Sequence, residues 1–204
     1  MSFASLPFLF AFLPLALAGF AIASRLAPLG GFAWAIAASL AFYGCASPRG
    51  LPVVCGALLL NAWVMTRIAA NTLRRIWWLT GGIALNLAFL VFGRMGGVPL
   101  PGASFIAFAQ IGLLLDQRES SPIPASRSAF LVLFFPHVLS GPVLRLRDIA
   151  ERLDNLRGRR FDGREAALGS IVFVIGLLKK TLLADPLASV VGPAFAEPSA
   201  LSPL

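Results

Sequence analysis

Long apolar runs without a charged side chain follow one another along most of the chain. Seven such runs cover residues 3–24, 26–48, 50–66, 76–93, 95–115, 128–144 and 166–178. A helix needs about 20 apolar residues to cross the hydrocarbon core of a bilayer. Inside that core every backbone hydrogen bond must be made within its own segment or with neighbouring protein. The pattern therefore predicts an all-α integral membrane protein with about six to seven hydrophobic helices.

Composition agrees with this pattern. The chain has 204 residues, of which 58% are hydrophobic and 13% are charged. A soluble domain carries about 25% charged residues, so this chain has too little polarity to cover a globule in water. The net charge of +8 is spread over short loops. A nucleic-acid partner would require a basic patch on one folded face, so the partner that we expect is the lipid bilayer.

The first run permits two interpretations. Small residues around Ala16 and Ala18, and around Ala21 and Ala23, fit the cleavage site of a signal peptide. However, no lysine or arginine precedes Arg25, so the basic start of a signal peptide is missing. A retained membrane helix is therefore favoured.

The basic loops contain a conflict. Residues 67–75 carry three arginines, and residues 145–165 carry seven arginines with five acids. Both segments are expected in the cytoplasm by the positive-inside rule, but three apolar runs separate them. One run should therefore fail to cross. The first candidate is 128–144, where Pro136 and Pro142 interrupt a helix. The second is 95–115, whose first turn contains prolines and Gly102. We predict that 128–144 is kinked or re-entrant and that it is the last element of a membrane domain over 1–144.

The rest of the chain divides into three segments. Residues 145–165 alternate apolar and charged positions at helical spacing, which predicts a basic amphipathic helix on the cytoplasmic surface. A solvated loop helix without a ligand is an equally good interpretation. Residues 166–185 predict a further membrane helix with a Lys-Lys end, and the proline-rich residues 186–204 predict a loop-like tail.

His137 is the single histidine of the chain. It could act as a general base, since an ionisable group inside a membrane is often functional. The alternative, which we favour, is a neutral imidazole that binds a carbonyl freed by the proline kink. Cys45 and Cys55 have no further ligands at suitable spacing, so we expect neither a metal site nor a disulfide framework.

Four stretches, in the same order, resemble the membrane-bound O-acyltransferase family, and especially its alginate O-acetyltransferase branch. They are FLFAFLP (8–14), LPGASF (100–105), FFPHVLSGPVLRLRD (134–148) and GLLKKTLLAD (176–185). The resemblance implies many helices around a tunnel, in which an acetyl or other acyl group reaches a hydroxyl of an exported polysaccharide such as alginate. The signature and tunnel candidates that it marks are Pro136, Gly141, Pro142, Arg145, Lys179, Lys180 and Asp185.

Three of these candidates have alternatives. Lys179 and Lys180 either bind the phosphate of an acyl donor or an acidic carrier protein, or they anchor a helix end at the cytoplasmic face; anchoring is favoured. Arg145 is also suited to anionic headgroups. No bound cofactor is expected, and the sequence does not identify the acyl donor.

The resemblance also implies a missing part. The family places its catalytic histidines in a later half, in one case within Trp-His-Gly, whereas this chain has no histidine after His137. We therefore expect the N-terminal half of such an enzyme, without transfer activity by itself, in the inner (cytoplasmic) membrane. Its expected partners are a missing C-terminal half or exopolysaccharide-modification proteins. The alternative is a non-catalytic subunit or fragment that scaffolds an exopolysaccharide complex.

Overall fold

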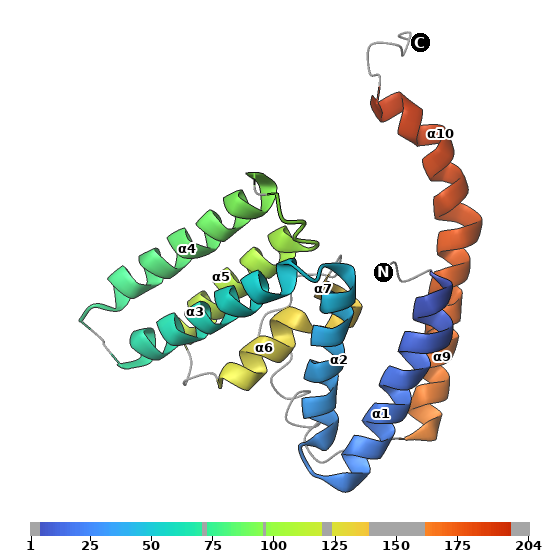
Figure 1. Cartoon of the computed structure of the whole chain (residues 1–204), viewed down its shortest axis with the longest axis horizontal. Coiled ribbons are helices and arrows are strands. Elements are labelled where there is room, and N and C mark those ends of the chain that lie inside the picture. The colour runs from blue at the N-terminus through green and yellow to red at the C-terminus, as the bar shows by residue number, and fades with distance from the viewer. Residues whose placement is uncertain (1–4, 71–72, 96, 120–123, 139–161, 197–204) are drawn as a thin grey trace. The chain divides into compact units, whose positions relative to one another are not determined.

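The computed structural model describes residues 5–70, 73–95, 97–119, 124–138 and 162–196 (Figure 1). Every regular element within these ranges is helical. Four helices there are long and apolar enough to cross a membrane: Phe8–Leu26, Gly50–Ala70, Arg75–Met95 and Gly163–Ser189. The predicted all-α multi-pass membrane protein is thus confirmed.

The chain forms two compact units, Met1–Arg160 and Phe161–Leu204. The first unit begins with a short π-helical turn, η1 (Phe8–Phe12), and the helices α1 (Leu13–Leu26) and α2 (Gly30–Ala46). A glycine allows α1 and α2 to lie close together, because a Cβ atom on Gly19 would sit 2.1 Å from the Trp34 ring. The indole nitrogen of Trp34 donates to the carbonyl of Ala16 at 2.9 Å.

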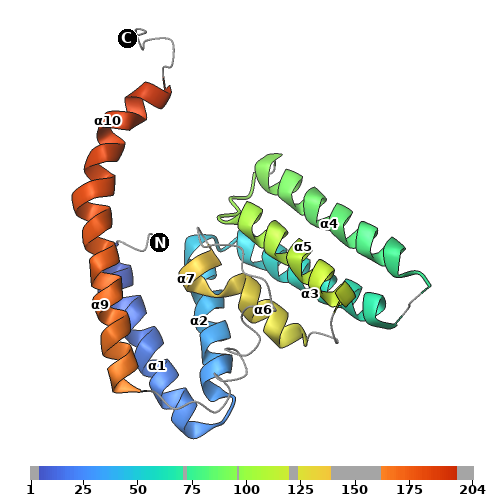
Figure 2. The same ribbon diagram turned by 180° about the vertical axis from the view of Figure 1, so that it is seen from behind.

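Three further helices lie side by side in both views of the molecule (Figures 1 and 2). They are α3 (Gly50–Ala70), α4 (Arg75–Met95) and α5 (Ala103–Glu119). The run 95–115 was expected to have a disrupted first turn, and α5 indeed starts only at Ala103. Gly102 precedes it with φ 73°, a left-handed conformation that glycine adopts without a steric cost.

The described part of segment 128–144 is a broken helix. Helix α6 (Ala125–Leu133) ends at Phe134, whose ψ of 110° is not helical, and the short α7 (Phe135–Val138) follows. Pro136 lies in the first turn of α7, where its missing N–H is not needed by the helix. The kink predicted for this segment is therefore present, and its re-entry on one side of the membrane stays a prediction.

The second unit corrects two sequence-based boundaries. Helix α9 (Gly163–Lys179) continues through the π-helical η2 (Lys180–Ala184) into α10 (Asp185–Ala196). Lys179 and Lys180 are therefore inside a continuous helical segment and do not end it. The prediction of a loop was wrong for residues 186–196. Pro186 directly follows the π-helical turn, in which the backbone N–H of Asp185 bonds to the carbonyl of Lys180, and this wider turn accommodates the proline without ending the helix.

The amphipathic helix predicted for 145–165 falls mostly outside the described residues. Its last three positions form the first turn of α9. Asp162 caps that turn, because its Oδ1 accepts a hydrogen bond from the backbone N–H of Arg164 at 2.9 Å.

Candidate functional site

Three polar side chains belong to α2, an otherwise apolar helix, and to the residue that follows its last turn. Ser39, Tyr43 and Ser47 follow one another at intervals of four residues, which places them on neighbouring turns. All three are almost wholly buried. A buried hydroxyl without a hydrogen bond is costly, so each of them needs a partner from another segment or from its own helix.

Ser39 joins α2 to the broken helix. Its hydroxyl donates to the carbonyl of Ala35 at 2.6 Å and accepts from the backbone N–H of Phe135 at 3.1 Å. Phe135 is the first residue of α7, and the break at Phe134 deprives its N–H of a partner within α6. A helix interrupted inside a membrane is tolerated when neighbouring protein bonds the freed backbone groups, and Ser39 does this.

Tyr43 and Ser47 hold the loop before α5. The Tyr43 hydroxyl donates to the carbonyl of Pro101 at 3.1 Å, and the Ser47 hydroxyl donates to the carbonyl of Pro99. Ser47 also accepts from the backbone N–H of Gly50 at 3.1 Å and so caps the start of α3. Proline-containing backbone that cannot continue a helix is thereby bonded to α2.

Phenylalanine rings bring the start of the chain to the same place. Rings of η1, α2 and α7 contact one another with centroids 5.3 to 6.2 Å apart, mostly tilted or edge to face. The residues are Phe8, Phe12, Phe42 and Phe135. Such aromatic contacts add to the stabilisation that burial of the rings provides.

We call this arrangement the α2 junction and define it by Ser39, Phe42, Tyr43 and Ser47. It gathers three of the four sequence stretches described above: 8–14, the start of 100–105, and the start of 134–148. These stretches are far apart in sequence, and the structure places them against one helix. The fourth stretch, 176–185, lies in the second unit.

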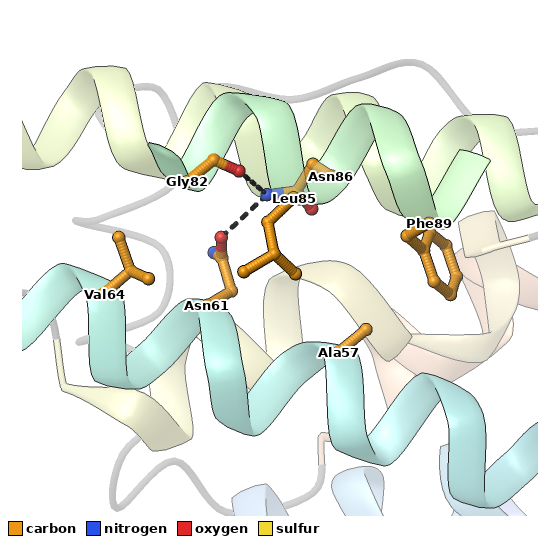
Figure 3. Close-up of a pocket in the computed structure, with 7 residues that line it drawn as sticks. All are labelled: Ala57, Asn61, Val64, Gly82, Leu85, Asn86 and Phe89. Atoms are coloured by element: carbon orange, nitrogen blue, oxygen red, sulfur yellow. Dashed lines mark hydrogen bonds between the residues drawn. The ribbon is translucent and has the colours of Figure 1, made fainter. Parts of the chain in front are cut away.

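A second polar group lies between α3 and α4 (Figure 3). The amide nitrogen of Asn86 donates to Oδ1 of Asn61 at 3.0 Å and to the carbonyl of Gly82 at 2.9 Å. Both asparagines are buried and line a small hollow with apolar neighbours. This bond from Asn86 to Asn61 joins α4 to α3, and hydrogen bonds between polar side chains are a common means of joining helices inside a membrane.

The predicted site residues are distributed as follows. Pro136 is exposed in α7, and the backbone of His137 is in the same helix, while the His137 side chain lies outside the description. Gly141, Pro142 and Arg145 are also outside the described residues. In the second unit, Nζ of Lys180 binds both carboxylate oxygens of Asp185 at 2.7 Å. Lys179 is exposed in the last turn of α9.

The ion pair has a simple geometric cause. Lys180 and Asp185 are five residues apart, and a π-helical turn brings residues at this spacing onto one face. Both side chains are about half exposed, so the pair contributes little to stability.

Sequence reasoning missed the polar residues of the first unit. Ser39, Tyr43 and Ser47 carried a signal, since they recur every four residues within an apolar run. Asn61 and Asn86 are isolated amides within such runs, and a polar group at membrane depth usually has a specific partner. Which residues would meet could not be derived from these positions alone. Within the part of the chain that is described, no group of three or more metal-ligating side chains is brought together.

Known proteins with similar sequences are O-acetyltransferases. The chain is 31% identical over 212 residues to a probable alginate O-acetylase of Pseudomonas fluorescens, an alignment that covers 96% of the chain and 41% of the relative. It is 30% identical over 227 residues to the corresponding protein of Azotobacter vinelandii, covering 96% of the chain and 44% of the relative.

A third relative is a peptidoglycan O-acetyltransferase of Helicobacter pylori. The identity is 28% over 229 residues, which cover 87% of the chain and 43% of the relative. The chain thus spans less than half the length of the curated relatives that it matches. No family model and no solved structure matches it. The relatives confirm the resemblance that the four sequence stretches predicted.

Proposed function

Because the chain is a homologue of the alginate O-acetylases of the membrane-bound O-acyltransferase family, we propose that it forms part of an enzyme that acetylates polysaccharide hydroxyls. The acceptor would be an exported or cell-wall polysaccharide. Both kinds of relative are named for acetylation of such a polymer, alginate in one case and peptidoglycan in the other.

The α2 junction is the observation that carries this proposal. Three stretches that resemble the family are bonded or packed against one helix by Ser39, Tyr43 and the phenylalanine rings. The stretches 100–105 and 134–148 are held by hydrogen bonds to backbone atoms. A junction of this kind fixes the position of interrupted backbone inside the membrane, which a tunnel for a polar substrate requires.

In the proposed reaction an acyl group moves from an oxygen or sulfur atom of the donor to a hydroxyl oxygen of the polysaccharide. The polysaccharide hydroxyl oxygen forms a bond to the acetyl carbonyl carbon, the bond from that carbon to the donor breaks, and the hydroxyl proton passes to a base. Apolar surroundings that exclude water would limit hydrolysis of the donor. His137 stays a candidate for the base, on the ground that it is the single histidine of the chain.

We also propose the cytoplasmic (inner) membrane as the location. The support is the family resemblance together with several apolar helices, which make the chain a multi-pass membrane protein. The basic segments 67–75 and 145–165 are then expected on the cytoplasmic face.

The test is made in the organism that encodes the chain. The gene is deleted and restored, and base-labile acetate is measured separately on secreted polysaccharide and on the cell wall. We expect deletion to remove acetate from one of the two fractions, which identifies the acceptor. Unchanged acetate in both fractions would contradict acyl transfer and favour the non-catalytic scaffold.

The contribution of the α2 junction is tested by restoring the gene with Tyr43→Phe, which removes the bond to Pro101 and keeps the ring. Thr80→Val is the matched control, because among the described residues the Thr80 hydroxyl bonds only to carbonyls of its own helix, those of Ile76 and Trp77. At equal protein levels, Tyr43→Phe should lower the acetate content and Thr80→Val should not. Equal acetate in the two strains would show that this hydroxyl does not position anything that the reaction needs.

A further inference from the structure

Aromatic and basic side chains gather where α3 ends and α4 begins. Three of the four tryptophans of the chain and three arginines lie between positions 63 and 78. They are Trp63, Arg67, Arg74, Arg75, Trp77 and Trp78. This part of the molecule is at the ends of two helices of 21 residues each, long enough to span the hydrocarbon core.

Arg67 is held between two of the rings. Its guanidinium carbon lies 5.1 Å from the Trp63 ring centroid and 5.9 Å from the Trp78 ring centroid. The two indoles contact each other edge to face, with centroids 5.2 Å apart and an interplanar angle of 89°. Trp63 and Arg67 are one helical turn apart, and Trp78 reaches them from the neighbouring helix.

The stacked guanidinium of Arg67 has no acceptor among the described residues. Its side chain makes neither a hydrogen bond nor an ion pair there, although a guanidinium carries five N–H donors in its plane. Arg75 is different, because its Nη2 donates to the carbonyl of Gln117 at 3.0 Å and so ties α4 to the end of α5. Cation–π contact uses the face of a guanidinium and leaves its edge available for paired hydrogen bonds to two oxygens of an anion such as phosphate.

The surroundings suit a lipid headgroup better than a soluble anion. Trp77 and Leu73, at the start of α4 and just before it, are exposed to 76% and 95%, so this end of the helix pair carries exposed apolar side chains as well as arginine. Tryptophan is typical of the level where acyl chains meet headgroups, and arginine at a helix end extends to the same level. The acids of the neighbouring helix end are Asp116 and Glu119, which leaves this end of the three helices with a basic excess.

We propose that Arg67, held by Trp63 and Trp78, binds the phosphate of an anionic phospholipid in the leaflet at this end of α3 and α4. Trp77 and Leu73 would contact the acyl chains of the same lipid. The proposal is independent of the acetyl-transfer function, since it concerns a lipid of the bilayer and involves neither the donor nor the acceptor of the acetyl group.

The test uses the full chain in nanodiscs of phosphatidylcholine with about one part in ten of phosphatidylglycerol, an anionic lipid. Bromine is placed on the acyl chains of one lipid at a time, and the quenching of tryptophan emission is measured. The parent should show about fivefold enrichment of phosphatidylglycerol over its mole fraction, the factor that about 1 kcal/mol per arginine corresponds to. Quenching in proportion to mole fraction would overturn the proposal.

Two substitutions of Arg67 distinguish binding by the planar edge of its guanidinium from a general attraction of anionic lipid to positive charge. Arg67→Gln should remove the enrichment, and Arg67→Lys should reduce it, because lysine keeps the charge and loses the planar pair of donors. Arg94→Gln is the control, since Arg94 is an exposed arginine at the opposite end of α4. Loss of enrichment in Arg94→Gln equal to that in Arg67→Gln would show non-specific attraction and contradict the proposed site.

A last arm distinguishes lipid from free phosphate. Inorganic phosphate and sodium chloride are added to parent nanodiscs at equal ionic strength. For a lipid site, both salts should lower the enrichment of phosphatidylglycerol equally, because each screens the attraction between Arg67 and the headgroup to the same extent. Displacement of phosphatidylglycerol by inorganic phosphate alone would mean that the site binds the free anion, and the lipid would then be the wrong ligand.

Discussion

At the scale of single residues, the buried polar side chains determine how apolar helices meet. Ser39 bonds a backbone N–H of another helix, and Asn61 and Asn86 bond each other. Gln110 differs from these, because it is fully buried and neither atom of its amide has a partner among the described residues. Inside an apolar environment a satisfied group stabilises a specific contact, whereas an unsatisfied one costs free energy.

Ser39→Ala tests the first of these bonds. The substitution leaves the Phe135 N–H without its acceptor, which should cost about 1–3 kcal/mol. The midpoint of heat-induced unfolding in detergent should fall accordingly. Ser24→Ala is the control, because within the described part of the chain the Ser24 hydroxyl donates only to the carbonyl of Ala21 in its own helix. Equal midpoints for the two variants would show that α7 does not depend on Ser39.

Gln110→Leu tests the unsatisfied amide. Leucine has a similar volume and no polar atoms. The substitution should therefore leave the free energy of unfolding unchanged or raise it by up to about 3 kcal/mol, and the unfolding midpoint should stay or rise accordingly. The same detergent assay measures it, with the bonded Asn86→Leu as a comparison that should be destabilised. A lower midpoint for Gln110→Leu would mean that the amide binds a group outside the described residues.

At the scale of elements, glycine positions set how closely the helices approach. A Cβ atom on Gly82 would lie 2.8 Å from a methyl group of Leu114 on α5 and 2.9 Å from a methyl group of Val64 on α3. A Cβ atom on the adjacent Gly81 would meet nothing within 4 Å. Gly82 therefore lies at the contact of three helices, and Gly81 faces away from it.

The two glycines provide a matched pair of substitutions. Gly82→Ala should destabilise the chain by about 1–3 kcal/mol, since the branched Val64 side chain has little freedom to move away. Gly81→Ala should stabilise it by about 0.5–1 kcal/mol, because alanine restricts the unfolded chain and favours the helix. Unfolding midpoints of both variants beside the parent measure the difference. The same change in both would contradict the close three-helix contact.

At the scale of the whole molecule, the number of crossings decides which segments share a side of the membrane. Helices α4 and α5 and the broken segment that starts with α6 lie between residue 73 and residue 163. The break at Phe134 leaves α6 with nine residues, fewer than the roughly 20 of a straight crossing, and re-entry of this segment stays a prediction.

Cysteine labelling tests the topology. Leu73→Cys and Gly163→Cys are made separately in a background without Cys45 and Cys55, the two cysteines of the chain. Both positions are exposed. We expect an impermeant thiol reagent to label neither in intact cells and both in opened membranes. Labelling of one position only in intact cells would place the two on opposite sides and exclude re-entry.

The sequence by itself determined the fold class, most helix positions and the relationship to O-acetyltransferases. Apolar length alone specifies a helix in a bilayer, since the backbone has to satisfy its hydrogen bonds locally. Prolines and Gly102 likewise marked the late start of α5 and the break near Pro136. Local patterns failed at residues 186–196, where a π-helical turn accommodates Pro186 and the helix continues.

Only the tertiary structure decided which side chains meet. The bonds of Ser39 to Phe135 and of Tyr43 to Pro101 join positions 96 and 58 residues apart. Likewise, Arg67 finds its second indole on the neighbouring helix. Helical periodicity shows which residues share a face of one helix, but the partner of that face depends on how the helices are arranged in space. The α2 junction is for this reason a property of the packed helices and of no single segment.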